Sequence, residues 1–240
     1  MPIDLTLLAQ YDTPTICNTI ELFEVRPRTA GYMDGRVRAC FPEMPPAVGY
    51  ASTATIRCAF PPKEGDVYGT LDEQAARFSS LPGPPIVVFQ DLDDPAVAAT
   101  FGEVMCSAYK AFGAVGIVTS GAARDLDQVR RLAFPAFSNG VICSHGYSHI
   151  GDLHGAVRVG GIAIHAGDLI HADANGVTTI PLEIASEVPQ AAAEFMAAES
   201  IVLDYLKSGR PDAAAFKEAR LAMVDAIAAL GKRARGKRGR

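Results

Sequence analysis

The side chains of this sequence best suited to chemistry are a glutamate and, after twenty intervening residues, an adjacent arginine and aspartate. Glu103 follows Gly102, and Arg124 is directly followed by Asp125. Carboxylate oxygens suit a hard divalent cation such as Mg²⁺. A guanidinium can hold a substrate carboxylate through two parallel hydrogen bonds. If these side chains lie together, one small site could hold both a metal ion and an organic acid.

The residues between these groups predict the elements that would bring them together. Apolar residues at helical spacing predict a short amphipathic helix that stops at Gly113: Phe101, Val104, Met105, Ala108 and Phe112. The apolar run 115–118 is short enough for a buried strand. Because this strand would run back beside the helix, we expect both charged ends and the free amides near residue 102 to meet.

Each end of the stretch also has a structural interpretation. Thr100 and Glu103 have the spacing of a capping box, in which the glutamate only satisfies a backbone donor at a helix start. Asp125 and Gln128 could cap a helix that begins near Leu126 in the same way. Arg124 could be a solvated surface arginine. The sequence leaves these alternatives open beside the functional one.

Three segments resemble one known family. The acidic residue, twenty intervening residues and Arg124-Asp125 resemble the acidic-x20-Arg-Asp motif of the RraA-like family. Residues 49–59, GYASTATIRCA, resemble an early strand of that family, and residues 159–181, VGGIAIHAGDLIHADANGVTTIP, resemble its long glycine-rich signature. The similarity spans residues 12–209. The family contains class II pyruvate aldolases, which cleave 4-hydroxy-4-methyl-2-oxoglutarate and 4-carboxy-4-hydroxy-2-oxoadipate, and protein regulators of ribonuclease E.

The resemblance implies an α/β fold of the swivelling, layered β/β/α type, with an added C-terminal helix. It also implies a homotrimer or homohexamer with the site at a subunit interface. We expect residues 1–209 to form the RraA-like domain, 210–231 the added helix, and 232–240 a disordered basic tail. Strand patterns near 48–56 and 86–89, and helix patterns near 71–81 and 182–206, agree with an α/β fold. Asp94-Pro95 predicts a further helix start.

The resemblance further implies roles for individual residues. Asp125 would hold Mg²⁺ or Mn²⁺ with the support of Glu103. Glu199 resembles a family glutamate that reaches the metal site of a neighbouring subunit, although an intersubunit salt bridge would explain it equally well. Arg124 would bind the substrate carboxylate and face the developing enolate. The amides expected to hold the same or a distal carboxylate belong to Gly102, Glu103, Val104, Met105 and Cys106.

These roles together predict a metal-dependent carbon–carbon lyase that acts on a 2-oxo acid through a pyruvate enolate. The reaction would be retro-aldol cleavage, oxaloacetate decarboxylation or both. The characterised aldolases carry aspartate at the first acidic position, so Glu103 departs from them by one methylene group and the substrate could be another 2-oxo or hydroxy acid. The alternative function is a non-catalytic regulator of a ribonuclease-type partner. A methyltransferase finds no support, because no glycine-rich loop follows the first strand.

Charge and composition limit the other functions. The 240 residues carry a net charge of −5, and residues 232–240 hold six basic and no acidic residues. Removing these six charges from −5 leaves −11 on the rest, which argues against broad nucleic-acid binding. No apolar run approaches a membrane span, and the N-terminus lacks the pattern of a signal peptide. The five cysteines form no C-x-x-C pair, so we expect a reduced, cytoplasmic protein.

All five histidines lie between residues 145 and 171, at 145, 149, 154, 165 and 171. The cluster invites a zinc or iron site, but no pair has the helical spacing of two ligands on one face. We therefore expect ordinary core or surface histidines, one of which could line the pocket. Asp168 and Asp173 stand in turn-like contexts, where aspartate bonds its own backbone.

Overall fold

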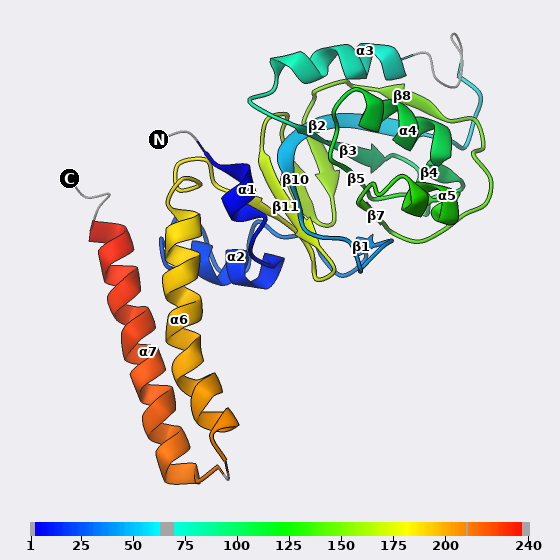
Figure 1. The fold of residues 1–240 in the computed structure, drawn as a ribbon. Helices are drawn as coiled ribbons and strands as arrows, with labels where there is room; N and C mark the ends of the chain where they lie inside the picture. Colours follow the sequence, from blue (N-terminus) through cyan, green and yellow to red (C-terminus); the bar gives the residue numbers. More distant parts are fainter. Residues whose placement is uncertain (1–2, 63–69, 210, 237–240) are drawn as a thin grey trace. The chain divides into compact units, whose positions relative to one another are not determined.

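The computed structural model describes residues 3–62, 70–209 and 211–236, and these form two compact units (Figure 1). Residues 30–180 make up one unit, which we call the sheet unit. Residues 1–29 and 181–240 make up the other, which we call the helical unit. Residues 181–209 thus group with residues 1–29, whereas the sequence predicted one domain over residues 1–209. Each unit is described separately below.

The sheet unit is built on eight strands in the order β1-β7-β5-β3-β2-β11-β12, with β8 also paired to β2. Strands β2, β3, β5 and β7 are parallel to one another, and the flanking pairs are antiparallel. Two-stranded ribbons, β9–β10 and β4–β6, complete the unit. The bounds of the strands are β1 Arg38–Ala39, β2 Ala47–Arg57, β3 Pro85–Asp91, β4 Ala99–Phe101, β5 Gly116–Thr119, β6 Ala122–Ala123, β7 Ala136–Ser138, β8 His149–Gly151, β9 Val157–Val159, β10 Ile162–Ile164, β11 Leu169–Asp173 and β12 Gly176–Ile180.

Both faces of this sheet are apolar, as expected for parallel strands covered on two sides. Successive residues of β3 point to opposite faces, so Val87 and Phe89 enter one core while Ile86 and Val88 enter the other. The first core includes side chains of α3, α4 and α5, and the second includes Val157, Val159 and Ile164 of the β9–β10 ribbon. A ribbon, the sheet and a set of helices thus form successive layers, which confirms the expected β/β/α fold class.

The helices of the sheet unit are short. Their bounds are α3 Leu71–Ala76, the following 3₁₀ turn η1 Arg77–Ser80, α4 Glu103–Ala111 and α5 Leu126–Arg131. Helix α4 buries Met105, Cys106 and Tyr109 against the sheet. The Tyr109 hydroxyl donates to Gln74 Oε1 over 2.6 Å, and both side chains are fully buried, so this bond fastens α4 to α3. The bond lies near the C-terminal end of α4, and the buried Met105 and Cys106 anchor the first turns of the helix.

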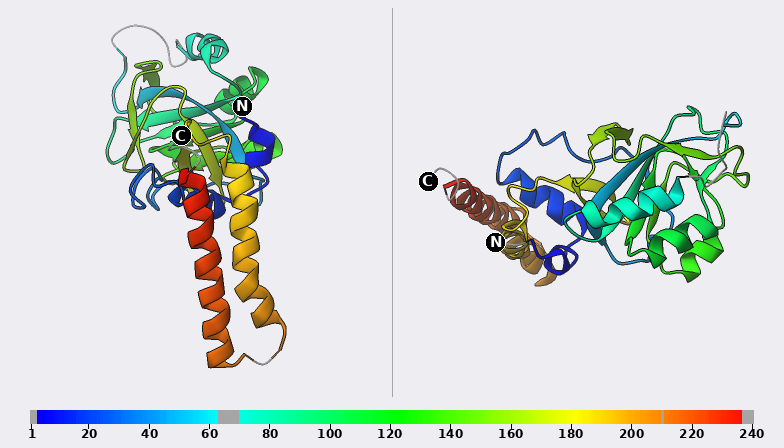
Figure 2. Two further views of the ribbon diagram at one scale, coloured as in Figure 1. Left: turned by 90° about the vertical axis from the view of Figure 1, so that its left-hand side faces the viewer. Right: turned by 90° about the horizontal axis from the view of Figure 1, so that it is seen from above.

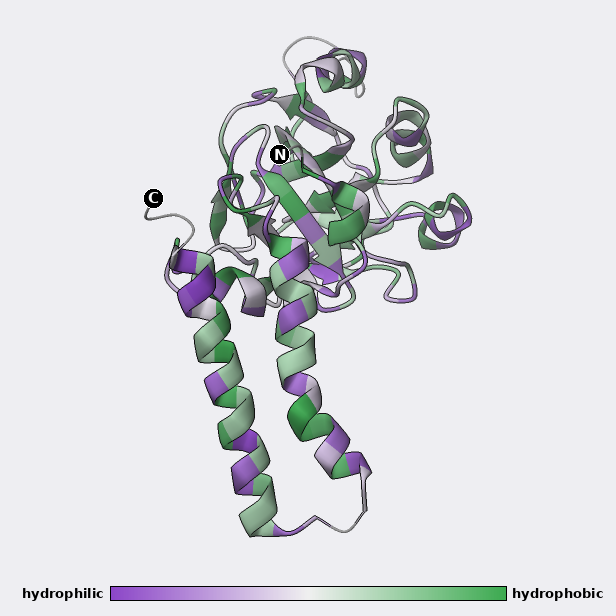
Figure 3. Ribbon diagram, turned by 60° about the vertical axis from the view of Figure 1, so that its left-hand side comes forward, coloured by the Kyte–Doolittle hydropathy of each residue, from purple (hydrophilic) through white to green (hydrophobic). Residues whose placement is uncertain are grey.

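The helical unit contains α1 Leu5–Leu8, α2 Thr13–Glu21, α6 Val188–Lys207 and α7 Ala213–Gly236. Helices α6 and α7 run antiparallel side by side (Figure 2). Apolar and polar residues are mixed along both helices (Figure 3), and several large apolar side chains of α6 and α7 are exposed. No helix among the described residues is long and apolar enough to cross a membrane.

Most of the expected elements are present, with three differences. Phe101 ends strand β4 and does not belong to α4, because the extended Gly102 starts the helix one residue later. The stretch after Asp94-Pro95 leads into β4 without a helix, so that prediction was wrong. Helix α7 continues to Gly236, so the described part of the basic segment is helical and not disordered. Residues 237–240 of the predicted tail lie outside the described residues.

Candidate functional site

The structure brings the two ends of the charged motif together, as the sequence predicted. The backbone N–H of Glu103 donates to Asp125 Oδ2 over 3.0 Å. Arg124 Nε lies 3.9 Å from the same oxygen, and the Arg124 N–H donates to the Phe101 carbonyl over 3.0 Å. The Arg124 and Asp125 side chains are 27% and 33% exposed, so both face a partly open surface. The Asp125 carboxylate, the Arg124 guanidinium and the backbone of Glu103 therefore lie together at the start of α4.

Asp125 takes an unusual backbone conformation to reach this position. It precedes α5 in the left-handed region, at φ 55° and ψ 40°, which aspartate tolerates better than most residues. Its side chain makes no hydrogen bond to its own helix and accepts instead from the first residue of α4. The predicted cap between Asp125 and Gln128 was therefore wrong. Asp125 caps the neighbouring helix, where a negative charge is favoured.

The capping box predicted between Thr100 and Glu103 was also wrong. The residue that precedes α4 is Gly102, and Glu103 occupies the first helical position, so it cannot reach back as a third-position residue would. Thr100 instead shares a 3.0 Å hydrogen bond between its hydroxyl and that of Thr119. The Glu103 carboxylate makes no hydrogen bond or ion pair with any described residue. It is exposed and available to a ligand.

Gly102 is required for the close approach of the two ends. A Cβ at this position would lie 2.5 Å from Asp125 Oδ2 and 3.1 Å from both Cγ and Nε of Arg124. The backbone of Gly102 is extended, so the constraint is lack of space and not an unusual φ. A larger residue would push the guanidinium and the carboxylate away from the start of α4.

Only part of the predicted row of amides remains free. The Glu103 N–H is used by Asp125, and the Cys106 N–H donates to the Gly102 carbonyl over 3.1 Å. The N–H groups of Val104 and Met105 belong to the first turn of α4, where helical amides have no intrahelical partner. These two amides and the positive end of the helix dipole suit an anionic group. Cys106 therefore contributes packing, not binding.

A small cavity of about 20 Å³ lies at the start of α4, next to Arg124. Gly102, Val104 and Met105 line it together with His145 and Ser148. His145 shares a 2.8 Å hydrogen bond between Nδ1 and the Gly146 carbonyl, and its own carbonyl accepts from the Ser148 hydroxyl over 2.5 Å. His145 thus lines this small cavity, and a role for it in substrate choice stays a prediction. Ser148 was missed, and only its closeness to His145 in the sequence could have indicated it.

The donor set fits a hard divalent cation better than a soft one. All described contacts of the Asp125 carboxylate involve Oδ2, which leaves Oδ1 for a ligand. The described residues contain no group of three His, Cys, Asp or Glu that could hold a metal ion. Mg²⁺ keeps several waters and takes only one or two protein carboxylates, so the metal role expected of Asp125 and Glu103 would not need a third carboxylate. Burial raises the pKa of the Cys106 thiol, which disfavours a thiolate ligand there.

Other sequence candidates lie elsewhere. Asp168 Oδ2 accepts the His165 N–H and Asp173 Oδ1 accepts the Asn175 N–H, each over 2.8 Å, so both aspartates have the structural roles expected of turn residues. Glu199 lies half-buried on α6 in the helical unit. Its role as a ligand supplied by a neighbouring subunit stays a prediction.

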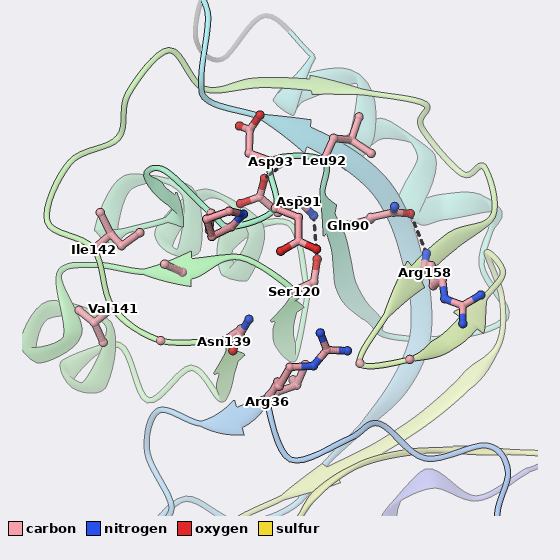
Figure 4. Close-up of a pocket in the computed structure, with 18 residues that line it drawn as sticks. Arg36, Gln90, Asp91, Leu92, Asp93, Ser120, Asn139, Val141, Ile142 and Arg158 are labelled. Atoms are coloured by element: carbon pink, nitrogen blue, oxygen red, sulfur yellow. Dashed lines mark hydrogen bonds between the residues drawn. The ribbon is translucent and has the colours of Figure 1, made fainter.

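A much larger cavity, of about 600 Å³, lies where β3, β5 and β7 end (Figure 4). Its most buried acid is Asp91, which is 8% exposed. Burial is the main cause that raises the pKa of the Asp91 carboxyl to about 6. A hydrogen bond from the Asp93 N–H opposes this rise, and the negative charges of Asp93 and Asp94 add to it. Asp91 was not predicted from the sequence, where its signal is an aspartate at the end of a buried apolar strand.

The structure is that of a layered α/β protein in which Arg124, Asp125 and the start of α4 lie together. The family model described as "RraA-like: Aldolase/RraA" matches residues 13–179, and the chain belongs to this family. A protein of Halalkalibacterium halodurans named as a putative 4-hydroxy-4-methyl-2-oxoglutarate aldolase is 36% identical over 107 residues, which cover 44% of this chain and 50% of that protein. The matched region therefore spans about half of that relative's length. The family is one of aldolase-like enzymes and RraA-like regulators.

Two solved structures share the fold. An uncharacterized protein from Pseudomonas syringae pv. tomato aligns with a TM-score of 0.71 and 22% identity over 92% of this chain and 95% of that one. An unusual member of the RNase ES inhibitor RraA protein family, from Streptomyces coelicolor, aligns with a TM-score of 0.63 and 22% identity over 82% and 94% of the two chains. At this level of identity the likeness establishes the fold alone.

The first prediction concerns Gly102. We expect Gly102→Ala to lower turnover of the 2-oxo acid substrate predicted from the sequence about 100-fold. The new methyl group displaces Arg124 and Asp125, and small misplacements of reacting groups are costly. The matched control is Gly35→Ala, since a Cβ at Gly35 would meet no atom within 4 Å. Steady-state kinetics of both variants would check this. Unchanged kinetics in a folded Gly102→Ala protein would contradict the geometry described here.

The second prediction concerns Asp91. Its pKa is raised in the folded state from 3.8 to about 6, so the folded state binds more protons between these values and stability falls as pH rises through this window. We expect Asp91→Asn to remove this loss, which is on the order of 2 kcal/mol in the free energy of unfolding. Denaturant unfolding of both proteins at pH 4.5 and pH 7.5 is the measurement. A difference between the two proteins that is the same at both pH values would contradict the assignment.

Proposed function

We propose that the protein is a divalent-metal-dependent lyase that cleaves a carbon–carbon bond of a 2-oxo acid. The observation that carries the proposal is the convergence of Arg124, Asp125 and Glu103 at the start of α4. The substrates we assign are 4-hydroxy-4-methyl-2-oxoglutarate or a similar 4-hydroxy-2-oxo acid, and oxaloacetate. Membership of the Aldolase/RraA family supports the reaction class.

The substrate carboxylate would bind where positive charge is gathered. Arg124 carries the guanidinium of the site and is only 27% exposed, so its hydrogen bonds to a carboxylate would be partly shielded from water. The free N–H groups of Val104 and Met105 lie at the positive end of α4 and would bind a second oxygen of the same or the distal carboxylate. Together these groups fix the end of the substrate next to the bond that breaks.

A bound Mg²⁺ or Mn²⁺ ion would act as a Lewis acid that polarises the 2-oxo group. Asp125 would hold the ion through Oδ1 while Oδ2 stays bonded to the Glu103 amide, and the Glu103 carboxylate would support it. Arg124 would also stabilise the negative charge that develops on the 2-oxo oxygen, which is the group that must be stabilised for this bond to break.

The retro-aldol step splits the substrate between C3 and C4. The 4-hydroxyl loses its proton and becomes a carbonyl, the C3–C4 bond breaks, and its electron pair forms the enolate of pyruvate. Protonation of C3 then gives pyruvate. The hydroxyl proton would pass to a water molecule in the site. Decarboxylation of oxaloacetate yields the same enolate, since loss of CO₂ leaves the electron pair on C3.

A second copy of the chain would complete the site. The cavity beside Arg124 holds only about 20 Å³, too little for a 2-oxo acid, and Val104 at its rim is 64% exposed and open to contact with another copy. We therefore place the site at an interface between copies in a homotrimer or homohexamer, to which Glu199 of a neighbouring copy would contribute a further carboxylate.

The regulator alternative has less support than the sequence indicated. A regulator would be favoured by the basic segment after residue 231, because basic side chains can bind an anionic partner. In the helical unit, Arg233 forms an ion pair with Glu194 over 2.5 Å, and Arg235 forms one with Glu24 over 3.0 Å and donates to the Leu22 carbonyl. These two arginines therefore have partners within the helical unit, which gives this part of the basic segment a structural role.

The third prediction tests the lyase. We expect Mg²⁺-dependent release of pyruvate from 4-hydroxy-4-methyl-2-oxoglutarate or oxaloacetate, after subtraction of uncatalysed decay. Arg124→Ala should lower kcat/KM at least 100-fold because the guanidinium holds the substrate and stabilises the enolate. Arg131→Ala, on the exposed end of α5, should behave as wild type.

Pyruvate release would be followed by a coupled dehydrogenase assay with Mg²⁺, with Mn²⁺ and with EDTA. Turnover that survives EDTA would exclude the metal-dependent reaction. Absence of turnover on both substrates, with folded protein and either ion, would overturn the proposal and favour a regulator.

A further inference from the structure

We propose that the large cavity at the ends of β3, β5 and β7 is a second ligand site, which binds a small monocarboxylate carrying hydrogen-bond donors. The shared chemistry is a carboxylate for Arg158 and a hydroxyl or ammonium group for Asp91. A sugar acid has both features, and so does an amino acid. The site is independent of the proposed lyase centre, because Glu103, Arg124 and Asp125 do not line it.

The position of the cavity in the sheet is that of a ligand site. Gln90 and Asp91 end β3, Ser120 follows β5, and Asn139 follows β7. These three strands are adjacent and parallel, so their carboxyl ends meet at one edge. Ligands of open α/β sheets bind beyond the carboxyl ends of parallel strands. The volume of about 600 Å³ is within the range of small-molecule sites.

Asp91 is the buried group that a ligand would complete. Its Oδ1 accepts the Asp93 N–H over 2.9 Å, while its Oδ2 is buried and has no hydrogen-bond partner among the described residues. Gly121 packs against Oδ2, and a Cβ there would lie 2.3 Å from this atom. A buried polar atom without a partner is costly, so a donor supplied from the cavity would be a net gain.

Asp93 shows by contrast what a purely structural aspartate looks like. Its Oδ2 accepts the N–H groups of Cys58 and Ala59 over 2.6 and 3.0 Å, and its Oδ1 lies 3.9 Å from Arg57 Nε. The neighbouring carboxylate is thus satisfied by the protein itself, whereas Asp91 is not. This difference assigns the binding role to Asp91.

The cation that remains free is Arg158. The guanidinium of Arg36 is already bonded to both oxygens of Asp34, at 3.0 and 2.7 Å. Arg158 is fixed through its backbone, whose N–H donates to Gln90 Oε1 over 2.7 Å, and its guanidinium makes no ion pair with a described residue. Figure 4 shows both arginines on one side of the cavity, with Val141 and Ile142 on the other.

The charges of the lining decide the class of ligand. Asp91, Asp93 and Asp94 would repel a dianion such as a phosphate ester, so a single carboxylate is the better match for Arg158. A cation is a poorer match, because Arg36 and Arg158 line the same cavity and would repel it. The Asn139 amide and the Ser120 hydroxyl can pair with further hydroxyl groups of the ligand.

Isothermal titration calorimetry would test the site with three probes: gluconate, L-serine and hexanoate, which lacks a donor. We expect gluconate or L-serine to bind saturably and hexanoate to bind at least 10-fold more weakly. Asp91→Asn, which replaces the free acceptor with a donor, and Arg158→Ala should each weaken binding at least 10-fold. The controls Asp225→Asn and Arg220→Ala, both on exposed positions of α7, should leave it unchanged.

Arg124→Ala separates this site from the lyase centre, and it should bind the probe as wild type does. Loss of binding in Arg124→Ala with retention in Asp91→Asn would place the ligand at the lyase centre and overturn the inference. Lack of saturable binding by gluconate and by L-serine would overturn it as well. Tighter binding of gluconate would identify a hydroxy acid, and tighter binding of L-serine an amino acid.

Discussion

The hydrogen bond from the Glu103 amide to Asp125 Oδ2 is the constraint on which the site depends. It joins the start of α4 to the start of α5, two elements separated by a buried strand. It forms only because Asp125 adopts the left-handed conformation and because Gly102 leaves room for its side chain. The same bond directs the second oxygen of Asp125 and the guanidinium of Arg124 toward one surface.

This arrangement combines stability and function in one residue. A carboxylate at a helix N-terminus stabilises that helix, typically by about 1 kcal/mol. The remaining oxygen of the same carboxylate stays available for a metal ion or a substrate. A residue held in the left-handed region carries some strain, and such strain is tolerated at positions that the surrounding structure fixes. The buried bond between Tyr109 and Gln74 supplies part of that fixation by fastening α4 to α3.

The sequence predicted which charged residues meet, but it did not predict the hydrogen bonds between them. Helical and strand spacing between residues 101 and 118 was enough to bring Glu103, Arg124 and Asp125 together, since a helix, a turn and a strand return the chain to its starting point. The capping partners were predicted wrongly, because capping motifs describe contacts within one helix and Asp125 caps another. The role of the basic segment was also hidden, because Arg233 pairs with a glutamate far away in the sequence.

The cavity at Asp91 could not be predicted from sequence motifs. Its walls come from three strand ends and a ribbon that no local pattern links, and its significance lies in a missing hydrogen bond, which only three-dimensional contacts reveal. The sheet unit therefore presents two polar centres, one formed by a recognisable motif and one formed by topology. Both use a carboxyl oxygen that the protein leaves free.

The most direct test of the central claim compares Asp125→Asn with Asp125→Ala in turnover and in the free energy of unfolding. Asparagine can still accept the Glu103 N–H and tolerates the left-handed conformation, so it should retain stability within about 1 kcal/mol while turnover falls at least 100-fold. The Asp125→Ala variant should lose turnover, and its free energy of unfolding should fall by about 2 kcal/mol because the cap is lost and the backbone is strained. Wild-type turnover in a stable Asp125→Asn protein would show that Asp125 only caps a helix and would contradict the account.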